Sequence, residues 1–443
     1  MSRKIYPLRL WLFIVVVMSG VAGSGGQAAE LGHIEKAIVK HVDQNVEQAL
    51  RDLEEVVNLN SGTMNFAGVR QVGDFFRTRL DALGFETHWV DGASFARAGH
   101  LVAEHKGSGS GPALLLIGHL DTVFEADSPF QHYEAVNDSI VRAPGIADMK
   151  GGDVIIVQAL SALRATGVLE KITVSVIMTG DEERSGHPLT LARKALTEAA
   201  KGADIAIGFE DGDGDPATAI VARRGATQWK LVVSGMSAHS SQVFQERVGA
   251  GAIYEASRIL TGFYDRLAAE EYLTFNPGVI LGGTDVDFDS TKARGSAFGK
   301  TNVVAQHAVV AGDLRTISLE QLRDAKAAMQ AIVAENLPRT NAKLIFRDSY
   351  PPLSPTAGNH KLLALLDETS RDLGLGPVSP VDPNKAGAAD ISFTAGYVKM
   401  AIDGLGLGGA DDHTVRETGN VKTLSIQAKR AAVLIFRLTR DAR

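Results

Sequence analysis

Residues 114–123 read LLLIGHLDTV, an unbroken apolar run that ends in a histidine and an aspartate. A strand that is apolar on both faces is typical of a mostly parallel sheet covered by helices on both sides. Residues 172–178 and 205–209 form two further short apolar runs, and stretches that favour helices follow the first two runs at residues 152–166 and 188–200. The pattern predicts an α/β domain with a mixed, mostly parallel sheet flanked by helices.

The pattern changes after Arg223. Stretches that favour strands alternate with stretches that favour helices, in the order strand, helix, strand, strand, helix, strand. This order predicts a compact α/β sandwich with an antiparallel sheet, inserted at residues 224–349. Residues 30–223 and 350–443 then form one domain around the insertion. Within the insertion, strands are expected at residues 227–233, 278–282, 302–314 and 343–347, and helices at residues 249–267 and 319–335.

The first 29 residues have the pattern of a secretory signal peptide. Arg3, Lys4 and Arg9 accompany the start of an apolar stretch, and small residues follow it. The alternative is a membrane anchor, but the apolar run at residues 10–17 is shorter than the roughly 20 residues that a bilayer span needs. We therefore expect residues 1–29 to be removed, no stable membrane anchor after removal, and a periplasmic or secreted location.

The composition narrows the possible classes. The chain has 443 residues, of which 45% are hydrophobic and 22% charged, enough for a large core and two or more domains. The net charge is −7, and Lys and Arg are spread along the chain, so nothing indicates a nucleic-acid partner. Cysteine is absent, which excludes disulfides and thiolate ligands. A metal ion would have to be bound by imidazole and carboxylate groups.

A set of histidine and acidic residues lies where the expected strands end or in glycine-rich turns. An α/β protein gathers its active-site groups at the carboxyl ends of its strands. Two histidines and several carboxylates that converge there suggest a pair of metal ions that take part in hydrolysis. The residues are His119, Asp121, Asp148, Glu182, Glu183, Glu210 and His413.

Some of these residues have ordinary interpretations when taken alone. Asp148 precedes a predicted helix and would be an N-cap. Glu182 and Glu183 are harder to explain as surface residues, because adjacent like charges in a partly dry site repel unless a cation or a shared proton compensates. One of them can bind a metal ion while its neighbour accepts a proton from water. Asp211 competes with Glu210 as a ligand, and the sequence leaves this choice open.

Five segments resemble the motifs of a known family. In order they read GHLDTV, GIADMKGG, TGDEE, FED and HTVRE, and they resemble the di-zinc hydrolases that include glutamate carboxypeptidase, acetylornithine deacetylase, succinyl-diaminopimelate desuccinylase and aminoacylase. The resemblance implies a zinc aminopeptidase-like domain with two Zn²⁺ per subunit, and the ligand types also suit Co²⁺ or Mn²⁺. By this resemblance Asp148 would bridge the two ions. His119 and Glu210 would bind one ion, and Glu183 and His413 would bind the other.

The resemblance also implies roles for five residues around the ions. Glu182 would be the general base, and Asp121 would be the orienting residue. His239, in GMSAHSS, would reach across a homodimer formed by the inserted domain and stabilise the oxyanion in the partner's active site. Asn302 and Arg315 would hold the free carboxylate of the substrate, a task that suits the planar fork of Arg. Without the resemblance, His239 would be an ordinary loop residue and Arg315 a surface residue.

The pattern is nearest to glutamate carboxypeptidase-like members, so we expect an exported metallo-carboxypeptidase that releases a C-terminal amino acid from a peptide or N-acyl conjugate. The alternative is an aminoacylase or deacylase of N-acyl amino acids, since both reactions cleave an amide bond next to a free carboxylate. A third hypothesis is a non-catalytic, metal-free dimeric binding protein. Loss of the base or of a ligand would mark it, and this chain keeps Glu182 and the full ligand set. Many carboxypeptidase-like members carry GGTD where residues 385–393 read KAGAADISF, which leaves substrate contacts there undefined.

Overall fold

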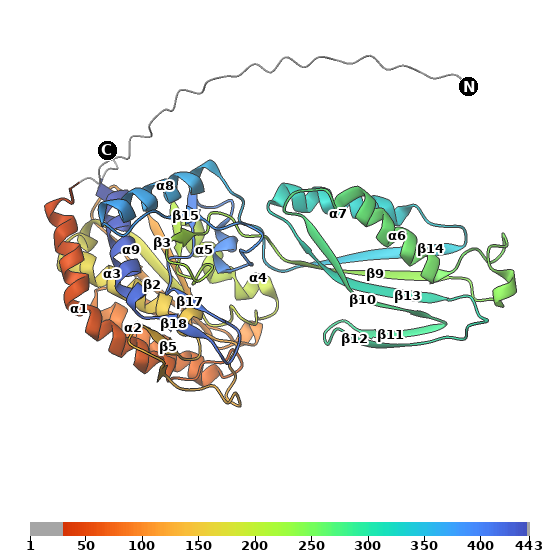
Figure 1. Ribbon diagram of the computed structural model, residues 1–443, viewed down its shortest axis with the longest axis horizontal. Coiled ribbons are helices and arrows are strands. Elements are labelled where there is room, and N and C mark those ends of the chain that lie inside the picture. The colour runs from red at the N-terminus through yellow and green to blue at the C-terminus, as the bar shows by residue number, and fades with distance from the viewer. Residues whose placement is uncertain (1–29, 441–443) are drawn as a thin grey trace, which may run out of the picture.

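The structure of this protein is a computed structural model that describes residues 30–440. The expected signal peptide, residues 1–29, lies outside the described residues, as do residues 441–443. Figure 1 shows two bodies of unequal size that are joined by two neighbouring segments of the chain. The larger body contains both ends of the described chain, and the smaller body is built from its middle part.

The central sheet of the larger body has six strands in the order β1-β2-β6-β3-β7-β16. β3 is parallel to both of its neighbours, β6 and β7, and β16 is parallel to β7. β2 is antiparallel to both β1 and β6. This sheet confirms the predicted α/β fold class. The strands are β1 (Glu86–Asp91), β2 (Gly99–His105), β3 (Leu114–His119), β6 (Val174–Thr179), β7 (Ile205–Gly208) and β16 (Met400–Ile402).

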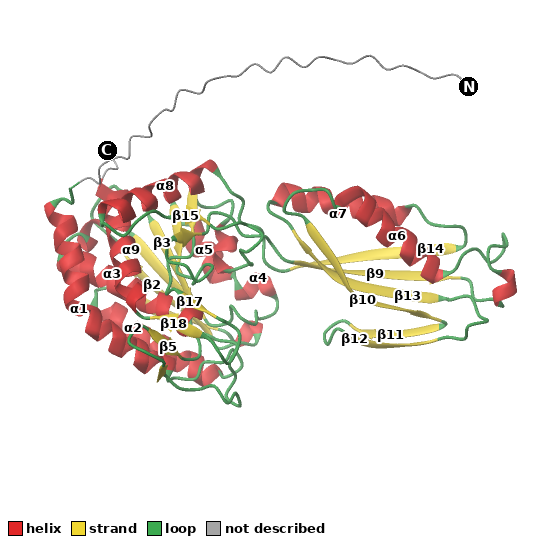
Figure 2. Ribbon diagram, viewed as in Figure 1, coloured by secondary structure: helices red, strands yellow, loops and turns green. Residues whose placement is uncertain are grey.

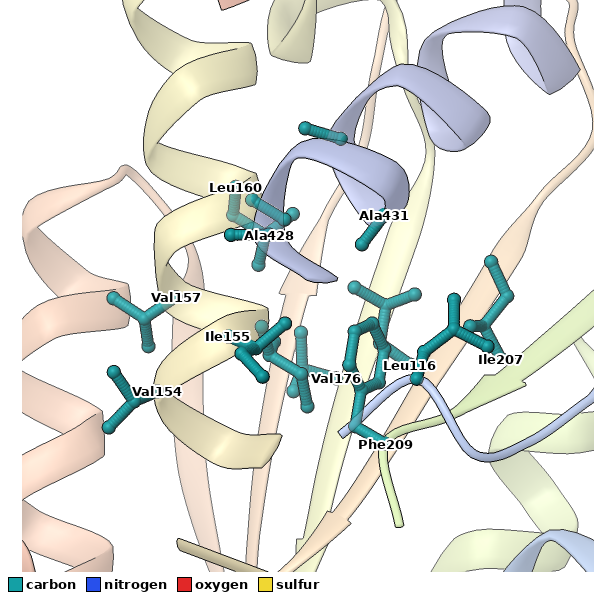
Figure 3. Packing of buried hydrophobic residues seen from close by; sticks show 14 of the residues in the cluster. Leu116, Val154, Ile155, Val157, Leu160, Val176, Ile207, Phe209, Ala428 and Ala431 are labelled. Atoms are coloured by element: carbon teal, nitrogen blue, oxygen red, sulfur yellow. The ribbon is translucent and has the colours of Figure 1, made fainter. Parts of the chain in front are cut away.

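Helices cover both faces of this sheet (Figure 2). On one face, Leu114 and Leu116 of β3 join a core cluster with α1, α2, α3, α8 and α9, part of which Figure 3 shows. On the other face, Leu115 and Ile117 pack with α5. Alternate residues of one strand are therefore buried on opposite sides, which explains the unbroken apolar run. The helices are α1 (His33–Val57), α2 (Phe66–Ala82), α3 (Gly151–Ala165), α4 (Leu189–Ala192), α5 (Lys194–Lys201), α8 (Ala357–Asp372) and α9 (Lys422–Arg440).

Short strands and helical turns complete the larger body. β4, β5, β17 and β18 form a small sheet in the order β17-β18-β5-β4, and β8 pairs with β15. The strands are β4 (Glu134–Ala135), β5 (Ile140–Arg142), β8 (Thr218–Ala219), β15 (Ser379–Pro380), β17 (Gly409–Ala410) and β18 (Thr418–Asn420). The turns are η1 (Ala93–Phe95), η2 (Ile146–Lys150), η3 (Leu169–Lys171) and η5 (Asp390–Thr394).

The smaller body has an antiparallel sheet in the order β10-β13-β9-β14 and a hydrophobic cluster of its own. α6 and α7 cover one face of this sheet (Figure 2), where Trp229 and Leu231 of β9 pack with Ile259 and Phe263 of α6. Its elements are β9 (Thr227–Gly235), η4 (Ser240–Gln242), α6 (Ala252–Leu267), β10 (Thr274–Gly283), β11 (Asp285–Asp289), β12 (Arg294–Phe298), β13 (His307–Arg315), α7 (Leu319–Ala334) and β14 (Thr340–Asp348).

The order of elements predicted for the insertion is present, with one addition. A hairpin of β11 and β12 lies between the second and third predicted strands, and the strand expected at residues 302–314 begins only at His307. The hairpin has a weak sequence pattern, because Val286 and Phe288 are the only apolar residues of β11. The domain limits at residues 224 and 349 stay a prediction.

Two segments cross between the bodies, and they are hydrogen-bonded to each other. The backbone groups of Arg223 and Leu353 exchange two hydrogen bonds of 3.0 Å. Within residues 30–440, no helix combines the length and the apolar character that crossing a membrane requires.

We expect Gly152→Ala to destabilise the larger body. α3 begins so close to the end of β7 that a β-carbon at Gly152 would lie 1.9 Å from the carbonyl oxygen of Phe209. Overpacking of this kind typically costs about 1–3 kcal/mol, which would lower the urea midpoint of unfolding. Gly202→Ala is the matched control, because a β-carbon there meets nothing closer than 3.5 Å. Equal midpoints for the two variants would contradict the close packing.

Candidate active site

The structure gathers the predicted histidine and acidic residues at one edge of the central sheet. β6, β3 and β7 are parallel neighbours, so their carboxyl ends lie side by side. The turn η2 and the loop between β17 and β18 reach the same edge. The strand ends carry His119 (β3), Glu182 and Glu183 (β6) and Glu210 (β7), and the turn and the loop add Asp148 and His413.

The carboxylate of Asp148 lies between two imidazole rings. Its Oδ1 is 2.9 Å from Nε2 of His119, and its Oδ2 is 2.9 Å from Nε2 of His413. Glu183 lies beside the second ring, with Oε2 3.1 Å from Nε2 of His413. Glu210 lies beside the first ring, with Oε1 3.7 Å from Nε2 of His119. The carboxylate of Asp148 therefore lies between two sets of side chains, His119 with Glu210 on one side and His413 with Glu183 on the other.

Asp121 orients His119 and also the loop with the two glutamates. Nδ1 of His119 lies 3.0 Å from the backbone carbonyl of Asp121. Because a carbonyl oxygen can only accept, Nδ1 carries the proton and Nε2 faces Asp148. The carboxylate of Asp121 accepts hydrogen bonds from the backbone N–H groups of Glu182 (3.0 Å) and Glu183 (3.2 Å). The ring is therefore held mainly by the backbone of Asp121, while its carboxylate holds the glutamate loop.

The two histidines compensate the charge of the buried carboxylates at this edge only in part. Burial and the negative charge of Asp390 raise the pKa of Glu182 well above its usual value. Burial and the charge of Asp148 raise the pKa of Glu183 to about 7, and its Oε1 is buried without a hydrogen-bond partner among the described residues. Burial also raises the pKa of Glu210 well above its usual value. Divalent cations would offset this cost, because they compensate clustered negative charge.

The same carboxylates favour the protonated form of both histidines. Hydrogen bonds to Asp148 and Glu183 raise the pKa of His413 to about 11. Burial alone would lower the pKa of His119, but the charge of Glu210 and the other nearby carboxylates raise it well above its usual value. A metal ion binds the neutral imidazole, so it would have to replace these protons.

Two groups of side chains have the spacing needed to hold a metal ion. The ligand atoms of His119, Asp148 and Glu183 lie within 4.8 Å of one another, and so do those of Asp148, Asp412 and His413. Asp148 belongs to both groups, as a bridging carboxylate would. Asp412 was not predicted, and its only signal in the sequence is its place directly before His413.

The geometry favours Glu210 over Asp211 as the residue that faces His119. The backbone N–H of Glu210 donates to Oδ1 of Asp403 over 3.3 Å, and Oδ2 of Asp403 is 2.9 Å from Nε of Arg223. This buried pair holds the end of β7 in place. Asp211 instead lines a cavity of about 370 Å³ together with Asp412. Neither Glu210 nor Asp211 belongs to the two groups with metal-binding spacing in residues 30–440, so the choice rests on the 3.7 Å distance between Glu210 and His119.

Glu417, for which the sequence predicts no role, holds the turn that carries Asp148. Its carboxylate accepts hydrogen bonds from the backbone N–H groups of Gly145 (2.8 Å), Ala147 (3.0 Å) and Asp148 (3.2 Å). Burial raises the pKa of Glu417 to about 7, although these N–H groups act in the opposite direction. Glu417 ends the HTVRE motif, but its partners are backbone groups about 270 residues earlier, which no local pattern reveals.

A buried network that the sequence did not reveal lies behind Glu182. Arg193 forms ion pairs with Asp181 and with Asp390, whose Oδ1 is 2.8 Å from its Nε. Nη2 of Arg193 also donates to the hydroxyl of Tyr350 over 2.8 Å. Tyr350 in turn donates to the backbone carbonyl of Glu182 over 2.9 Å. Because Tyr350 lies in the segment that returns from the smaller body, this network connects the crossing segments to the glutamate loop.

The three residues predicted to bind substrate do not come together within one chain. His239 forms an isolated β-bridge with Val303, so His239 and Asn302 lie in adjoining loops at the end of the smaller sheet away from the larger body. Arg315 ends β13 at the opposite end, with its Nε 2.8 Å from Oδ2 of Asp313. The nine residues of β13 place roughly 26 Å between these ends, at about 3.3 Å per residue.

Known proteins resemble this chain in sequence. A model of peptidase family M20/M25/M40 matches residues 115–437. Carboxypeptidase G2 of Pseudomonas sp. (strain RS-16) is 26% identical over 377 residues, which cover 82% of this chain and 83% of that protein. The succinyl-diaminopimelate desuccinylase of Leptothrix cholodnii is 32% identical over 136 residues, which cover 30% of this chain and 35% of that protein.

Solved structures share the fold. The aminopeptidase PepT from Bacillus cereus superposes with a TM-score of 0.70 at 20% identity, over 89% of this chain and 99% of that one. The YXEP protein of Bacillus subtilis, described as a dinuclear metal-binding peptidase of family M20, superposes with a TM-score of 0.61 at 14% identity, over 90% and 99%. The family resemblance of the five motifs is thus confirmed. Since the family model spans most of the chain, this protein belongs to peptidase family M20/M25/M40 and is a hydrolase of the metallopeptidase class.

Proposed function

We propose that this protein is a two-metal carboxypeptidase that hydrolyses the amide bond next to a free carboxylate and releases the C-terminal amino acid. The observation that carries the proposal is the Asp148 carboxylate, each oxygen of which faces one imidazole. The buried glutamates around it, whose pKa values are raised, give the site the negative charge that two cations would balance. Similarity to Carboxypeptidase G2 over 82% of the chain supports this activity.

The residues at the sheet edge fit a pair of divalent ions. His119, Asp148 and Glu210 would hold one ion, and Asp148, Glu183 and His413 would hold the other. Glu183 keeps a buried Oε1 without a hydrogen-bond partner among the described residues, which is what an unfilled ligand atom looks like. Two ions bound there would polarise the scissile carbonyl and lower the pKa of a water molecule. Family resemblance favours Zn²⁺, and the imidazole and carboxylate donors also suit Co²⁺ or Mn²⁺.

Glu182 is the residue we assign to proton transfer. Its backbone is fixed on both sides, by Asp121 at the N–H group and by Tyr350 at the carbonyl. Burial raises the pKa of its carboxyl well above the usual value, and a general base is more effective when its pKa is close to the working pH. Glu182 would take a proton from the attacking water and give it to the leaving nitrogen when the amide C–N bond breaks.

In a homodimer, the smaller body of one copy would contribute residues to the active site of the other copy. His239 and Asn302 lie at the far end of their own sheet, so they would act in the partner's active site, while Arg315 would hold the substrate carboxylate near the crossing segments. Phe244 and Tyr254 are 65% and 56% exposed, and such apolar surface is typical of an interface. β10 and β14 are the edge strands of the sheet, and an edge strand can pair with another copy.

An aminoacylase or deacylase is the second candidate. The 32% identity to a desuccinylase over 136 residues favours it. Both reactions need the same general base and the same residues to bind a free carboxylate. They differ only in the group on the carbonyl side of the amide bond, which is a peptide in one case and an acyl group in the other.

We also propose that the protein is exported to the periplasm or secreted. The charged start, the short apolar stretch and the small residues within residues 1–29 support this. Removal of that segment would leave no stable membrane anchor.

Metal binding should release protons and strengthen as the pH rises. Without metal the pKa of His413 is about 11, so this ring carries a proton at neutral pH that an incoming ion must displace. Calorimetric titration of Zn²⁺ into chelator-treated protein, in buffers of different ionisation enthalpy, should show net proton release and an affinity that falls between about pH 8 and about pH 6. His413→Ala should bind less metal and release fewer protons. An affinity independent of pH over this range would contradict the assignment.

Glu182→Gln should keep the metal content and lower kcat by at least about 100-fold, because an amide cannot accept the proton. Glu47→Gln, an exposed position in α1, is the control and should behave as the wild type. Mass spectrometry would follow the release of amino acids from dipeptides and from N-acetyl amino acids.

Faster cleavage of dipeptides is expected for a carboxypeptidase, and the reverse ranking would support the deacylase. If the purified protein held no stoichiometric metal and cleaved neither class, the enzyme proposal would fail in favour of a non-catalytic binding protein.

Mixing two impaired variants tests whether His239 acts across a dimer. His239→Ala removes the oxyanion donor, and Glu182→Gln removes the base. In a mixed dimer, one site combines an intact Glu182 with the partner's His239, so random exchange of subunits should restore about a quarter of wild-type activity. Light scattering should show a dimer. A mixture no more active than its two components would contradict the contribution in trans.

A further inference from the structure

The peptide group between Glu182 and Glu183 is hydrogen-bonded at both of its ends. Its N–H group, which belongs to Glu183, donates to Oδ2 of Asp121 over 3.2 Å. Its carbonyl group, which belongs to Glu182, accepts from the hydroxyl of Tyr350 over 2.9 Å. A peptide group is planar, so contacts at both ends fix its orientation. They therefore also fix the directions in which the two glutamate side chains leave the backbone.

The carboxyl group of Glu182 depends on this backbone more than that of Glu183 does. The carboxylate of Glu183 lies 3.1 Å from Nε2 of His413, and its side chain is only 4% exposed. The carboxyl group of Glu182, in contrast, forms no hydrogen bond or ion pair within residues 30–440. Its position therefore follows from the backbone of its own residue.

Tyr350 is held firmly enough to fix another residue. The backbone N–H of Ala226 donates to its carbonyl over 2.8 Å, which connects it to the segment that enters the smaller body. Pro351 follows it and restricts its backbone to extended conformations. Its ring packs against that of Phe393, with the ring centroids 5.1 Å apart. These three contacts leave the hydroxyl few positions.

Arg193 sets the direction in which the hydroxyl of Tyr350 donates. Nη2 of Arg193 donates to this hydroxyl over 2.8 Å and so occupies an acceptor position on its oxygen. The carbonyl of Glu182 can only accept, so the phenol proton points to it. Arg193 is buried and forms ion pairs with Asp181 and Asp390. Hydrogen bonds in such a chain polarise one another, which strengthens the bond to Glu182.

Tyr350 belongs to neither the glutamate loop nor the central sheet. It follows the end of β14 by two residues, in one of the two segments that join the bodies (Figure 1). Its contact with Glu182 spans 168 residues of the sequence. The alignment of a residue at the metal-binding edge of the larger body thus depends on a side chain at the exit of the smaller body.

We propose that Tyr350 is a positioning residue for the reaction, which acts through the carbonyl of Glu182 and keeps the two adjacent glutamates in separate roles. The proposal rests on the two-metal hydrolase function proposed above. With the peptide group fixed, Glu183 faces the metal site, and the carboxyl group of Glu182 faces the water that it deprotonates. Without the hydroxyl, the peptide group would be free to turn and would carry this carboxyl group away from the water. A general base must stay within hydrogen-bond reach of the proton that it accepts.

The test is Tyr350→Phe, which keeps the ring and removes only the hydroxyl. In the metal-loaded protein, kcat should fall at least about tenfold while KM changes less than about twofold, because the base is misplaced and the groups that bind substrate are not. The metal content should equal that of the wild type. Tyr397→Phe is the matched control, because it makes the same chemical change at a ring that is 47% exposed, and it should leave kcat unchanged.

A double-mutant cycle separates positioning of the base from a general role in stability. Adding Tyr350→Phe to Glu182→Gln should lower the residual kcat less than about twofold, because the base through which Tyr350 acts is already lost. A purely structural role would lower kcat by the same factor in both backgrounds. Ser185→Ala removes another contact of the Tyr350 hydroxyl, 3.2 Å long, and keeps the bond to Glu182. Its kcat should stay within about twofold of the wild-type value.

Three results would overturn the positioning role. One is a folded, metal-loaded Tyr350→Phe protein that is as active as the wild type, and another is an equal fall in kcat in the wild-type and Glu182→Gln backgrounds. The third is an equal fall for Tyr350→Phe and Ser185→Ala. Urea midpoints of unfolding show whether each variant is folded, and Tyr350→His, which also loses the hydroxyl, replaces Tyr350→Phe if that variant is unfolded. A wild type that holds no metal and cleaves neither dipeptides nor N-acetyl amino acids defeats the proposed function itself, and the positioning role with it.

Discussion

The candidate site depends on one constraint, which is that β6, β3 and β7 are parallel and buried on both faces. Leu115 and Leu116 point to opposite sides of β3 and both are fully buried, so the strand itself has no place for a charged group. Charge can appear only where the strands end, and parallel strands end at the same edge. His119 and the glutamates after β6 and β7 therefore meet without long loops. The same crowding makes their negative charge costly unless cations are present.

Much of this edge could be predicted from the sequence because it depends on short-range patterns. The run LLLIGH shows both the buried strand and the histidine at its end. The residues that hold the site in place could not be found in this way. Glu417 binds backbone N–H groups that have no sequence signature, and Arg193 pairs with Asp390, which lies in a different part of the chain and in a motif that departs from the family pattern.

Long-range geometry also explains the other differences between sequence and structure. Glu210 and Asp211 are equivalent in a sequence pattern, and only the direction in which the end of β7 points brings Glu210 to His119. The resemblance implied one task for Asn302 and Arg315, whereas the register of β13 puts them at opposite ends of a sheet. The β11–β12 hairpin has too few apolar residues to be recognised, yet it encloses a cavity.

The chain enters and leaves the smaller body at neighbouring points. Thr227 of β9 pairs with Asp348 of β14, and Arg223 forms a β-bridge with Leu353. About 130 residues separate Arg223 from Leu353 in the sequence. Once the smaller body has formed, it connects these two residues as closely as a loop of a few residues would. Closing a flexible loop of the full length would cost about 3 kcal/mol more in chain entropy than closing a loop of about four residues. Local folding of the insertion would therefore speed the addition of β16 to the central sheet, because the effective separation in sequence between β7 and β16 falls from about 190 to about 60 residues.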